Sequence, residues 1–175
     1  MGGKLLRKCS YLVALMLLLF GCGYHFSGEG PGPRPGLRSI AIPVFENSTS
    51  QAGLESRFAT ELRKDFILRS RLQVVPVDQA EGIMRGRITR IYTSQVGHRS
   101  SEQTIETRIY LTVDVRFEDT RTGEILWQDP AYTYFTVYFH DREDPIVTFE
   151  NRRRALEFLV QEMAIRIHDR FLINF

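Results

Sequence analysis

Cysteine is scarce in this chain: its 175 residues include only two, Cys9 and Cys22, both near the N-terminus. The rest of the sequence therefore has no thiol for a disulfide, a cysteine-bound metal or a covalent nucleophile. The HExxH, paired CxxC, GxSxG and glycine-rich phosphate-loop motifs are also missing. The four histidines are scattered along the chain, at His25, His98, His140 and His168. These absences argue against an enzyme, a metal site and a bound cofactor, and we expect none of the three.

A long hydrophobic run is missing as well. The N-terminal apolar segment, Tyr11–Phe20, is about half of the roughly 20 residues that a membrane-spanning helix needs. Basic residues precede it, as in a secretory signal peptide. The motif LFGC at 19–22 resembles a bacterial lipobox, whose cysteine receives a diacylglycerol and becomes the first residue of the mature chain. We therefore expect a signal peptide over 1–21 and lipidation of Cys22. A short membrane anchor, or a plain signal cut elsewhere, is the alternative.

Net charge gives no sign of a nucleic-acid partner. The formal net charge is only +2, and the expected signal peptide contains Lys4, Arg7 and Lys8 but no acidic residue. The basic pI of the whole chain, about 8.6, therefore belongs mostly to the precursor. In lipoprotein signals of this kind, an aspartate after the cysteine favours the inner membrane, and here that residue is Gly23. The resemblance thus implies the periplasmic side of the outer membrane, with acyl chains as the anchor.

Glycine and proline dominate the residues that follow the expected cleavage site. The sequence GYHFSGEGPGPRPGL at 23–37 cannot sustain a helix or a central strand. Such a composition predicts a tether over 22–37. The rest of the chain, 38–175, is long enough to bury a sizeable core, and we expect it to form a single domain.

Two segments have the periodicity of amphipathic helices. Within 51–69 the apolar residues recur every four positions, at Leu54, Phe58, Leu62 and Phe66. Within 148–171 a second apolar stripe contains Leu156, Leu159, Met163, Ile167 and Phe171. Each stripe predicts a long helix with one buried face.

Four segments have the alternation of β-strands. The clearest, 105–117, puts apolar residues on one side and charged or polar residues on the other, which firmly specifies its register. The segment 83–96 alternates imperfectly, and a bulge near Thr89 would reconcile its two halves. The other two are 38–47 and 125–139, the latter interrupted by Pro130. The order β-α-β-β-β-α predicts an α+β fold: about four strands in a mostly antiparallel sheet, with two long helices packed on one face.

The side of the sheet that faces away from the helices offers the candidate binding residues. If the helices cover Ile109, Val113 and Phe135, alternation places a second set on the opposite side: Arg108, Tyr110, Arg116, Tyr132, Tyr134 and Tyr138. Tyrosine suits a protein interface or an amphiphile, so we predict that this set faces a partner. The β propensity of tyrosine is the simpler alternative explanation.

Cations accompany these tyrosines. The strand 83–96 and the hairpin end expected after it contribute Arg85, Arg87, Arg90, His98 and Arg99. Arginine binds phosphate and carboxylate groups with two parallel hydrogen bonds. We therefore predict that this group binds an anionic ligand.

Several stretches resemble the LptE family of lipopolysaccharide-assembly lipoproteins. The start CGYHF at 22–26, the strand IAIPVFEN at 40–47 and the helix LESRFATELRKDFI at 54–67 carry the resemblance. The strand RGRITRI at 85–91, the long alternating strand and the C-terminal helix extend it along nearly the whole expected mature chain.

The resemblance implies a function. Members of this family plug the LptD β-barrel of the outer membrane, help it to assemble and take part in delivering lipopolysaccharide to the outer leaflet. They bind lipopolysaccharide, are not enzymes, and pack two helices on a four-stranded sheet. Similar opening strands also occur in lipoproteins of secretion pores and in activators of peptidoglycan synthases. An accessory role in another envelope machine is therefore the alternative.

Overall fold

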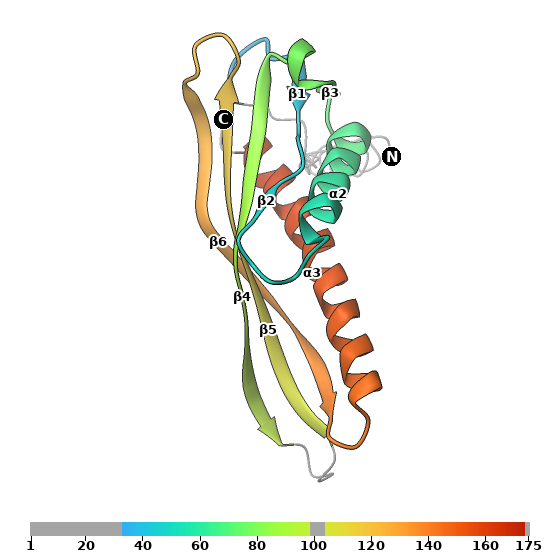
Figure 1. Ribbon diagram of the computed structural model, residues 1–175. Coiled ribbons are helices and arrows are strands. Elements are labelled where there is room, and N and C mark those ends of the chain that lie inside the picture. The colour runs from blue at the N-terminus through green and yellow to red at the C-terminus, as the bar shows by residue number, and fades with distance from the viewer. Residues whose placement is uncertain (1–32, 99–103, 174–175) are drawn as a thin grey trace, which may run out of the picture.

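The computed structural model describes residues 33–98 and 104–173. The expected signal peptide, Cys22, most of the expected tether and Arg99 lie outside the described residues. The described part contains two α-helices and a six-stranded sheet (Figure 1). Neither helix in this part combines the length and the apolar character needed to cross a membrane.

Three long strands form most of the sheet and pair as antiparallel neighbours: β4 (Gly82–His98), β5 (Thr104–Asp119) and β6 (Ile125–Asp141). Three short strands pair in parallel at its other side: β1 (Ser39–Ala41), β2 (Glu46–Asn47) and β3 (Gln73–Val74). The order is β3-β1-β4-β5-β6, with β2 also pairing with β4. A 3-10 turn, η1 (Val77–Gln79), leads from β3 towards β4.

The α+β class is confirmed, although the sheet is mixed and has more strands than the four expected. The predicted strand 38–47 is divided into β1 and β2, and Pro43 lies between them. Proline has no N–H to donate to a ladder, which explains the interruption. β1 and β2 then pair with separate parts of β4, around Gly82 and around Arg87.

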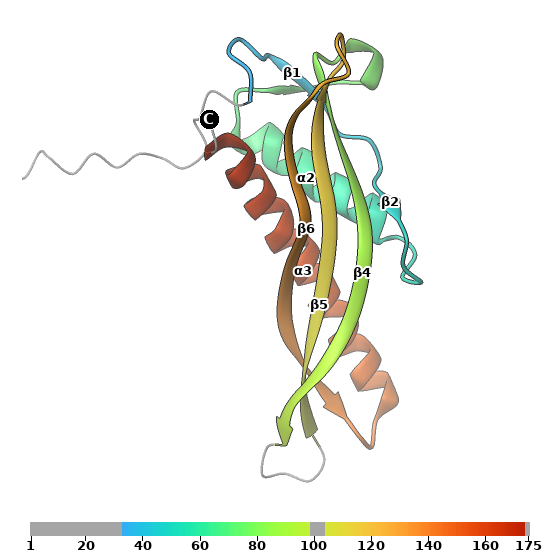
Figure 2. The same ribbon diagram turned by 90° about the vertical axis from the view of Figure 1, so that its left-hand side faces the viewer.

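Both helices lie on the same face of the sheet, as predicted (Figures 1 and 2). Helix α2 (Leu54–Arg69) packs beside α3 (Pro145–Ile173), and α3 runs along β6. An ion pair of 2.7 Å between Arg69 and Asp169 joins the two helices. Figure 2 looks onto the other face of the long strands, with the helices behind them. We call this uncovered surface of β4, β5 and β6 the open face.

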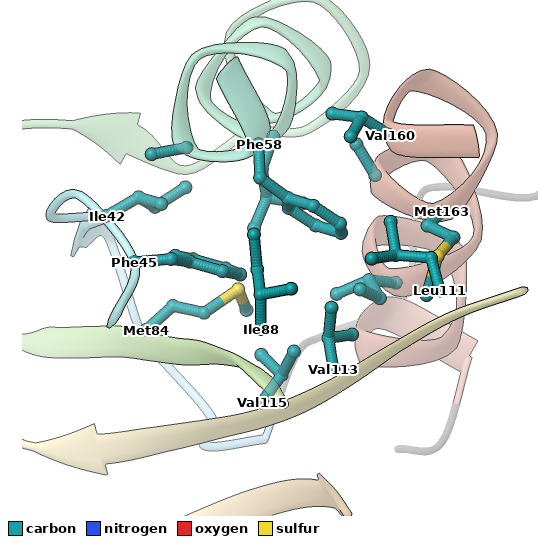
Figure 3. Close-up of a cluster of buried hydrophobic side chains, with 14 of the residues drawn as sticks. Ile42, Phe45, Phe58, Met84, Ile88, Leu111, Val113, Val115, Val160 and Met163 are labelled. Carbon is teal, nitrogen blue, oxygen red and sulfur yellow. The ribbon is translucent and has the colours of Figure 1, made fainter. Parts of the chain in front are cut away.

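The apolar stripes expected from the sequence meet in one core between the helices and the sheet (Figure 3). Phe58, Leu62 and Phe66 of α2 are fully buried, and so are Met163 and Ile167 of α3. The odd-numbered side chains of β5 from 107 to 117 complete the core from below. Each large apolar side chain buried in this way contributes about 1.5–3 kcal/mol, so this core is the main source of stability.

A close approach at Gly86 fits the segment between β1 and β2 onto this core. The Phe45 ring stacks on Phe58 with 5.0 Å between centroids. A Cβ atom at position 86 would lie only 2.1 Å from the Phe45 ring. Glycine on β4 therefore makes room for Phe45, and the Phe45 contact is part of how β4 meets the helices.

The bulge predicted near Thr89 is confirmed. The pairing of β4 with β5 shifts between Ile88 and Arg90, where one extra residue enters β4. Ile88 before the bulge is buried, and Ile91 after it packs against the same core although its number has the opposite parity. Consequently Arg85 and Arg87 before the bulge, and Arg90 after it, all project from the open face.

A second bulge lies in β6, at the proline noted in the sequence. Ala131, next to Pro130, has a positive φ of 54°, and the pairing with β5 shifts between Val113 and Val115. Trp127 and Asp129 face the helices before the bulge. The extra residue inverts the alternation, so that even-numbered residues face the helices after it.

The tyrosines of β6 therefore lie on the covered side, and the prediction that Tyr132, Tyr134 and Tyr138 face away from the helices is wrong. Tyr138 is only 8% exposed and belongs to the core. Arg166 of α3 donates to the hydroxyl of Tyr134 at 2.9 Å, and Arg170 of α3 lies 4.8 Å from the Tyr132 ring centroid. Phe135, which we expected under the helices, is on the open face. The sequence predicted an interruption at Pro130 but not that it would exchange the two faces.

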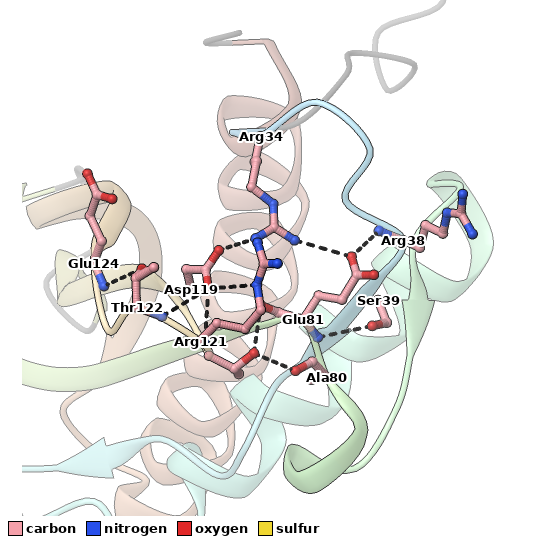
Figure 4. A network of polar contacts seen from close by, with 10 residues as sticks. Arg34, Arg38, Ser39, Ala80, Glu81, Asp119, Arg121, Thr122 and Glu124 are labelled. Atoms are coloured by element: carbon pink, nitrogen blue, oxygen red, sulfur yellow. Dashed lines mark hydrogen bonds and ion pairs between the residues drawn. The ribbon is translucent and has the colours of Figure 1, made fainter.

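A polar network fastens the start of the domain to the sheet (Figure 4). Arg34 pairs with Asp119 at the end of β5 and, at 3.4 Å, with Glu81 just before β4. Glu81 also accepts a hydrogen bond of 2.8 Å from the backbone N–H of Arg38. Backbone N–H groups of Arg121 and Thr122, together with the Arg34 guanidinium, hold the pKa of Asp119 below its ordinary value despite its burial. The last residues of the expected tether are thus docked at the β5–β6 turn.

Candidate functional site

The open face contains the candidate site, and its alternation is set by the two bulges. It presents the even-numbered residues of β5, the odd-numbered residues of β4 up to the bulge and the even-numbered ones after it. From β6 it presents the odd-numbered residues beyond Ala131. These residues form two regions that follow one another along the strands.

The first region is the arginine cluster, which we define as Arg85, Arg87, Arg90 and Arg116. Arg85 of β4 and Arg116 of β5 lie directly opposite each other. Like charges in such a pair destabilise a sheet unless another group compensates them. Glu118 does so, because the Nε atoms of Arg85 and Arg116 each donate to one of its two carboxylate oxygens. Although burial opposes it, these hydrogen bonds hold the pKa of Glu118 below its ordinary value.

Two further carboxylates border the cluster. Glu46 of β2 accepts a hydrogen bond of 2.6 Å from Arg87 Nε. Asp114 lies opposite Arg87 in the register and accepts the backbone N–H of Ala131 at 2.9 Å. Both Glu46 and Arg87 are more than half exposed, so their ion pair is weak and solvent can exchange with it.

A depression of about 180 Å³ lies among these side chains and is lined by residues of β2, β4, β5 and β6, including Arg85, Arg87 and Arg116. Each guanidinium has five N–H donors, so a carboxylate that takes the Nε–H leaves further donors on the same group. Three guanidinium groups around one depression can therefore receive the oxygens of a phosphate or a sugar acid. Sequence reasoning did not include Arg116 in the anion-binding group, although the alternation of β5 already placed it on this face.

The second region is the aromatic patch, which we define as Tyr92, Tyr110, Phe135, Val137 and Phe139. Tyr92 and Tyr110 stack with centroids 4.5 Å apart and planes 2° from parallel. Phe135 follows, 5.3 Å from Tyr110. Tyr92, Phe135 and Phe139 are each 42% exposed, which is unusual for three aromatic side chains on one surface.

Arg108 borders the aromatic patch. Its guanidinium carbon lies 5.0 Å from the Phe135 centroid, within the range of a cation–π contact. Its Nε atom is buried and makes no hydrogen bond within the described part of the chain. The predicted positions of Arg108 and Tyr110 on the open face are therefore correct, and their contact with a partner stays a prediction.

The remaining predicted anion-binding residues are His98 and Arg99. The backbone of His98 ends β4 opposite Ile105, whereas its side chain is outside the described residues, as is the whole of Arg99. Their part in anion binding stays a prediction. Sequence reasoning missed Phe135, Val137 and Phe139 as open-face residues, because only the position of the extra residue in β6 decides which side they occupy.

Among the described residues, His168 is fully buried, and its contacts belong to the packing of α3 against α2. His168 of α3 lies edge-on to Phe66 of α2, with ring centroids 4.9 Å apart, and its Nδ1 is 3.0 Å from the carboxylate of Asp169. Burial lowers the pKa of His168, against the opposing influence of Asp169. In residues 33–98 and 104–173 no group of three His, Cys, Asp or Glu side chains could hold a metal ion.

The fold and the open face together define an α+β domain that covers one face of its sheet with two helices and presents cations and aromatic rings on the other. The chain belongs to the LptE family: the family model, described as lipopolysaccharide-assembly, matches residues 37–171. No curated protein matches the sequence.

The comparison with solved structures finds likenesses at low sequence identity. A protein described as a neuraminyllactose-binding hemagglutinin homologue from Helicobacter pylori is 11% identical, with a TM-score of 0.54 over 86% of this chain and 90% of that one. A lipoprotein from Caulobacter crescentus is 14% identical, with a TM-score of 0.47 over 71% of this chain and 85% of that one. A minor lipoprotein from Acinetobacter baumannii is 16% identical, with a TM-score of 0.44 over 79% and 92%. At these identities the first likeness supports the fold alone, and we conclude nothing from the other two.

Proposed function

We propose that this protein is an outer-membrane lipoprotein that plugs the LptD β-barrel, helps it to assemble and takes part in the transport of lipopolysaccharide to the outer leaflet. The observation that carries the proposal is the family membership over residues 37–171. In this account the protein acts by binding, as a structural and transport component, and is not an enzyme.

The arginine cluster gives the proposal a physical mechanism. Lipopolysaccharide has anionic phosphates and sugar acids beside its acyl chains, and cations hold its molecules together in aggregates. Arg85, Arg87 and Arg116 around their depression offer charge-assisted hydrogen bonds to the same anionic groups. Because the cluster competes for these groups, it would separate individual lipopolysaccharide molecules and present them for transport.

Chemistry along the chain supports the placement in the barrel. The interior of an outer-membrane β-barrel is polar, and the outer sides of α2 and α3 contain ion pairs such as Arg153–Glu157 at 2.8 Å, beside exposed apolar residues such as Ile67 and Phe149. Acyl chains on Cys22 would hold the protein at the periplasmic leaflet, since each buried CH₂ group adds about 0.8 kcal/mol of membrane affinity. The network around Arg34 holds the domain end of the expected tether on the sheet.

Gentle detergent extraction of the native outer membrane tests the proposal. The full-length protein is tagged at its C-terminus, purified by affinity and analysed by mass spectrometry for protein and lipid. The proposal predicts one large β-barrel protein in stoichiometric amount, with lipopolysaccharide. A Cys22→Ala variant is the control for the anchor and should leave the outer-membrane fraction.

The competing account predicts a different set of companions. Purification with a secretion ring or a peptidoglycan synthase, in place of the barrel, would show that the protein serves another envelope machine. Recovery of the protein without any companion would also overturn the plug function and leave the family membership and the fold.

A further inference from the structure

We propose that the aromatic patch holds the acyl chains of the same anionic amphiphile whose phosphates bind the arginine cluster. The inference rests on the function proposed above and adds a second half to the binding site, together with a direction for the ligand. The headgroup would lie towards Arg116 and the chains would run along the strands towards Phe139.

Beyond its bulge, β6 has the reverse of the polarity that stability alone would favour. After the bulge, its tyrosines face the helices, where arginines of α3 contact Tyr132 and Tyr134. The purely apolar residues Phe135, Val137 and Phe139 face outward instead. A strand that only needed to be stable would place its apolar side chains inside and its hydroxyl groups outside. The outward Phe and Val therefore indicate that an apolar ligand covers this surface.

The aromatic patch is one continuous surface across three strands. The pairs Tyr92–Tyr110 and Tyr110–Phe135 are cross-strand neighbours in the register as well as in ring contact. Val137 and Phe139 continue the same side of β6 beyond Phe135. Flat rings beside branched side chains give a smooth apolar strip that runs parallel to the strands, and a flexible hydrocarbon chain can lie along such a strip.

Cations border the aromatic patch, which indicates that its ligand is an anionic amphiphile. Arg90 and Tyr92 are two residues apart on one side of β4, about 7 Å along the strand. At the other side of the patch, Arg108 covers Phe135 and keeps a buried Nε–H without a hydrogen-bond acceptor in the described residues. A purely apolar partner would leave these cations desolvated and unpaired, which is costly. A ligand with anionic groups next to its chains satisfies both regions.

The spacing and the order of the cations and the aromatic rings along β5 also support an amphiphilic ligand. From Arg116 to Tyr110 the strand advances about 20 Å, and from Tyr110 to Glu106 about a further 14 Å. The cations and the aromatic rings thus occupy successive parts of one strand direction. This order matches a molecule that lies along the strands. Its headgroup would be at the arginine cluster and its acyl chains at the aromatic patch.

Site-specific photocrosslinking in the native assembly tests the contact directly. A photoreactive phenylalanine analogue replaces Val137 or Phe139 in the full-length protein, and control proteins have it at Ile67 or Leu68, which are exposed apolar positions on α2. We expect lipopolysaccharide adducts from positions 137 and 139 and none from the two controls. Adducts with a protein in place of lipopolysaccharide would show that the patch is a protein interface and would overturn the inference.

Binding measurements with two probes separate the two halves of the site. The probes are lipopolysaccharide and its fully deacylated phosphosaccharide. The double variant Phe135→Ser and Phe139→Ser should bind lipopolysaccharide about tenfold more weakly. The same variant should bind the deacylated probe within about twofold of the unchanged protein. An Arg85→Gln and Arg116→Gln variant should weaken binding of both probes.

The outcomes distinguish this inference from the function on which it rests. If the serine variant binds both probes like the unchanged protein, the chains lie elsewhere and the inference fails, while the proposed function stands. If it loses both probes equally, the patch does not act on the chains and the inference fails as well. If the unchanged protein binds neither probe, the lipopolysaccharide-binding part of the proposed function fails and the inference falls with it.

Discussion

Arg85 and Arg116 lie opposite each other on neighbouring strands and share the carboxylate of Glu118 between their Nε atoms. Two like charges in one cross-strand pair are a poor choice for stability. A single carboxylate also neutralises only one of them. The two guanidinium groups and Glu118 therefore keep a combined charge of +1 at the edge of the depression, which would attract an anionic ligand although Glu46 and Asp114 also line it.

Replacement of the shared carboxylate tests this relationship. Glu118→Gln should lower the free energy of unfolding by up to about 1 kcal/mol, because the two guanidinium groups then repel each other. It should also strengthen the binding of an anionic ligand. Urea unfolding at low and high salt measures the first effect, and the loss should shrink at high salt as the repulsion is screened. Glu124→Gln in the exposed β5–β6 turn is the control, and an equal loss there would contradict the account.

The lowered pKa of Glu118 also has a sign that can be checked. Its contribution to stability is complete above the pKa of an unfolded glutamate, about 4.5, and is lost as the pH falls through the lower folded value. The stability of the unchanged protein and of Glu118→Gln should therefore converge in strong acid. A difference between the two proteins that stays constant from neutral pH to strong acid would argue against the hydrogen bonds of this carboxylate.

The buried His168 predicts a second pH dependence, with the same direction and a higher range. Burial lowers its pKa in the folded protein below the value of about 6.5 expected in the unfolded chain. Below about pH 6.5 the unfolded chain therefore binds a proton that the folded protein does not, and stability decreases as the pH falls. The charged groups that face the His168 ring are Asp169, Arg69 and Asp65, and the Phe66 ring packs against it.

Thermal unfolding between about pH 7 and pH 5 tests the histidine. His168→Met should flatten the pH dependence in this range, since methionine fills a similar space and does not titrate. Leu159→Met, a core substitution in α3 that removes no titratable group, is the control and should leave the dependence unchanged. Equal pH profiles for the unchanged protein and His168→Met would show that His168 does not control stability here.

Two aromatic truncations on opposite faces of β6 test the position of the bulge. Tyr138→Ala removes a side chain that is 8% exposed and should cost about 2–4 kcal/mol of unfolding free energy. Phe135→Ala removes one that is 42% exposed and should cost about 1 kcal/mol or less. Equal losses of unfolding free energy, or a larger loss for Phe135→Ala, would contradict the bulge and support an uninterrupted alternation in β6.

The close approach of Phe45 to Gly86 predicts that a side chain at position 86 lowers the stability of the protein. Gly86→Ala should destabilise the protein by about 1–3 kcal/mol, because the added Cβ atom meets the buried Phe45 ring. Phe45→Leu in the same chain should return part of the loss, since leucine has no ring at that place. A simple sum of the two single losses in the double variant would mean that the two positions do not interact.

The sequence predicted much of this fold, for reasons visible in particular segments. The strand around Leu111 and Val113 alternates without interruption, and the stripe from Leu54 to Phe66 repeats every four residues, so local pattern and tertiary burial agree there. The bulge near Thr89 could be inferred because the apolar residues on its two sides have opposite parity and all need burial. The separation of β2 from β1 within the predicted strand 38–47 could not be foreseen, because a stretch of two residues has no period that shows where it pairs.

The candidate site was harder to predict than the fold. In β6, tyrosine, phenylalanine and valine all suit a strand, so composition does not say which of them face the helices. The decision depends on the extra residue at Ala131, whose positive φ is a tertiary outcome. Arg85, Arg87 and Arg90 could be found from charge on one strand, whereas the role of Arg116 depends on a cross-strand partner that only the register reveals.

The most direct test of the account is the affinity of the purified full-length protein for lipopolysaccharide when the arginines around the depression are neutralised. A triple variant with Arg85→Gln, Arg87→Gln and Arg116→Gln should bind at least about tenfold more weakly. The control has the same loss of charge elsewhere, with Arg57→Gln, Arg121→Gln and Arg153→Gln on α2, the β5–β6 turn and α3. It should bind within about twofold of the unchanged protein. Equal affinities for the two triple variants would contradict the claim that the open face of this sheet receives lipopolysaccharide.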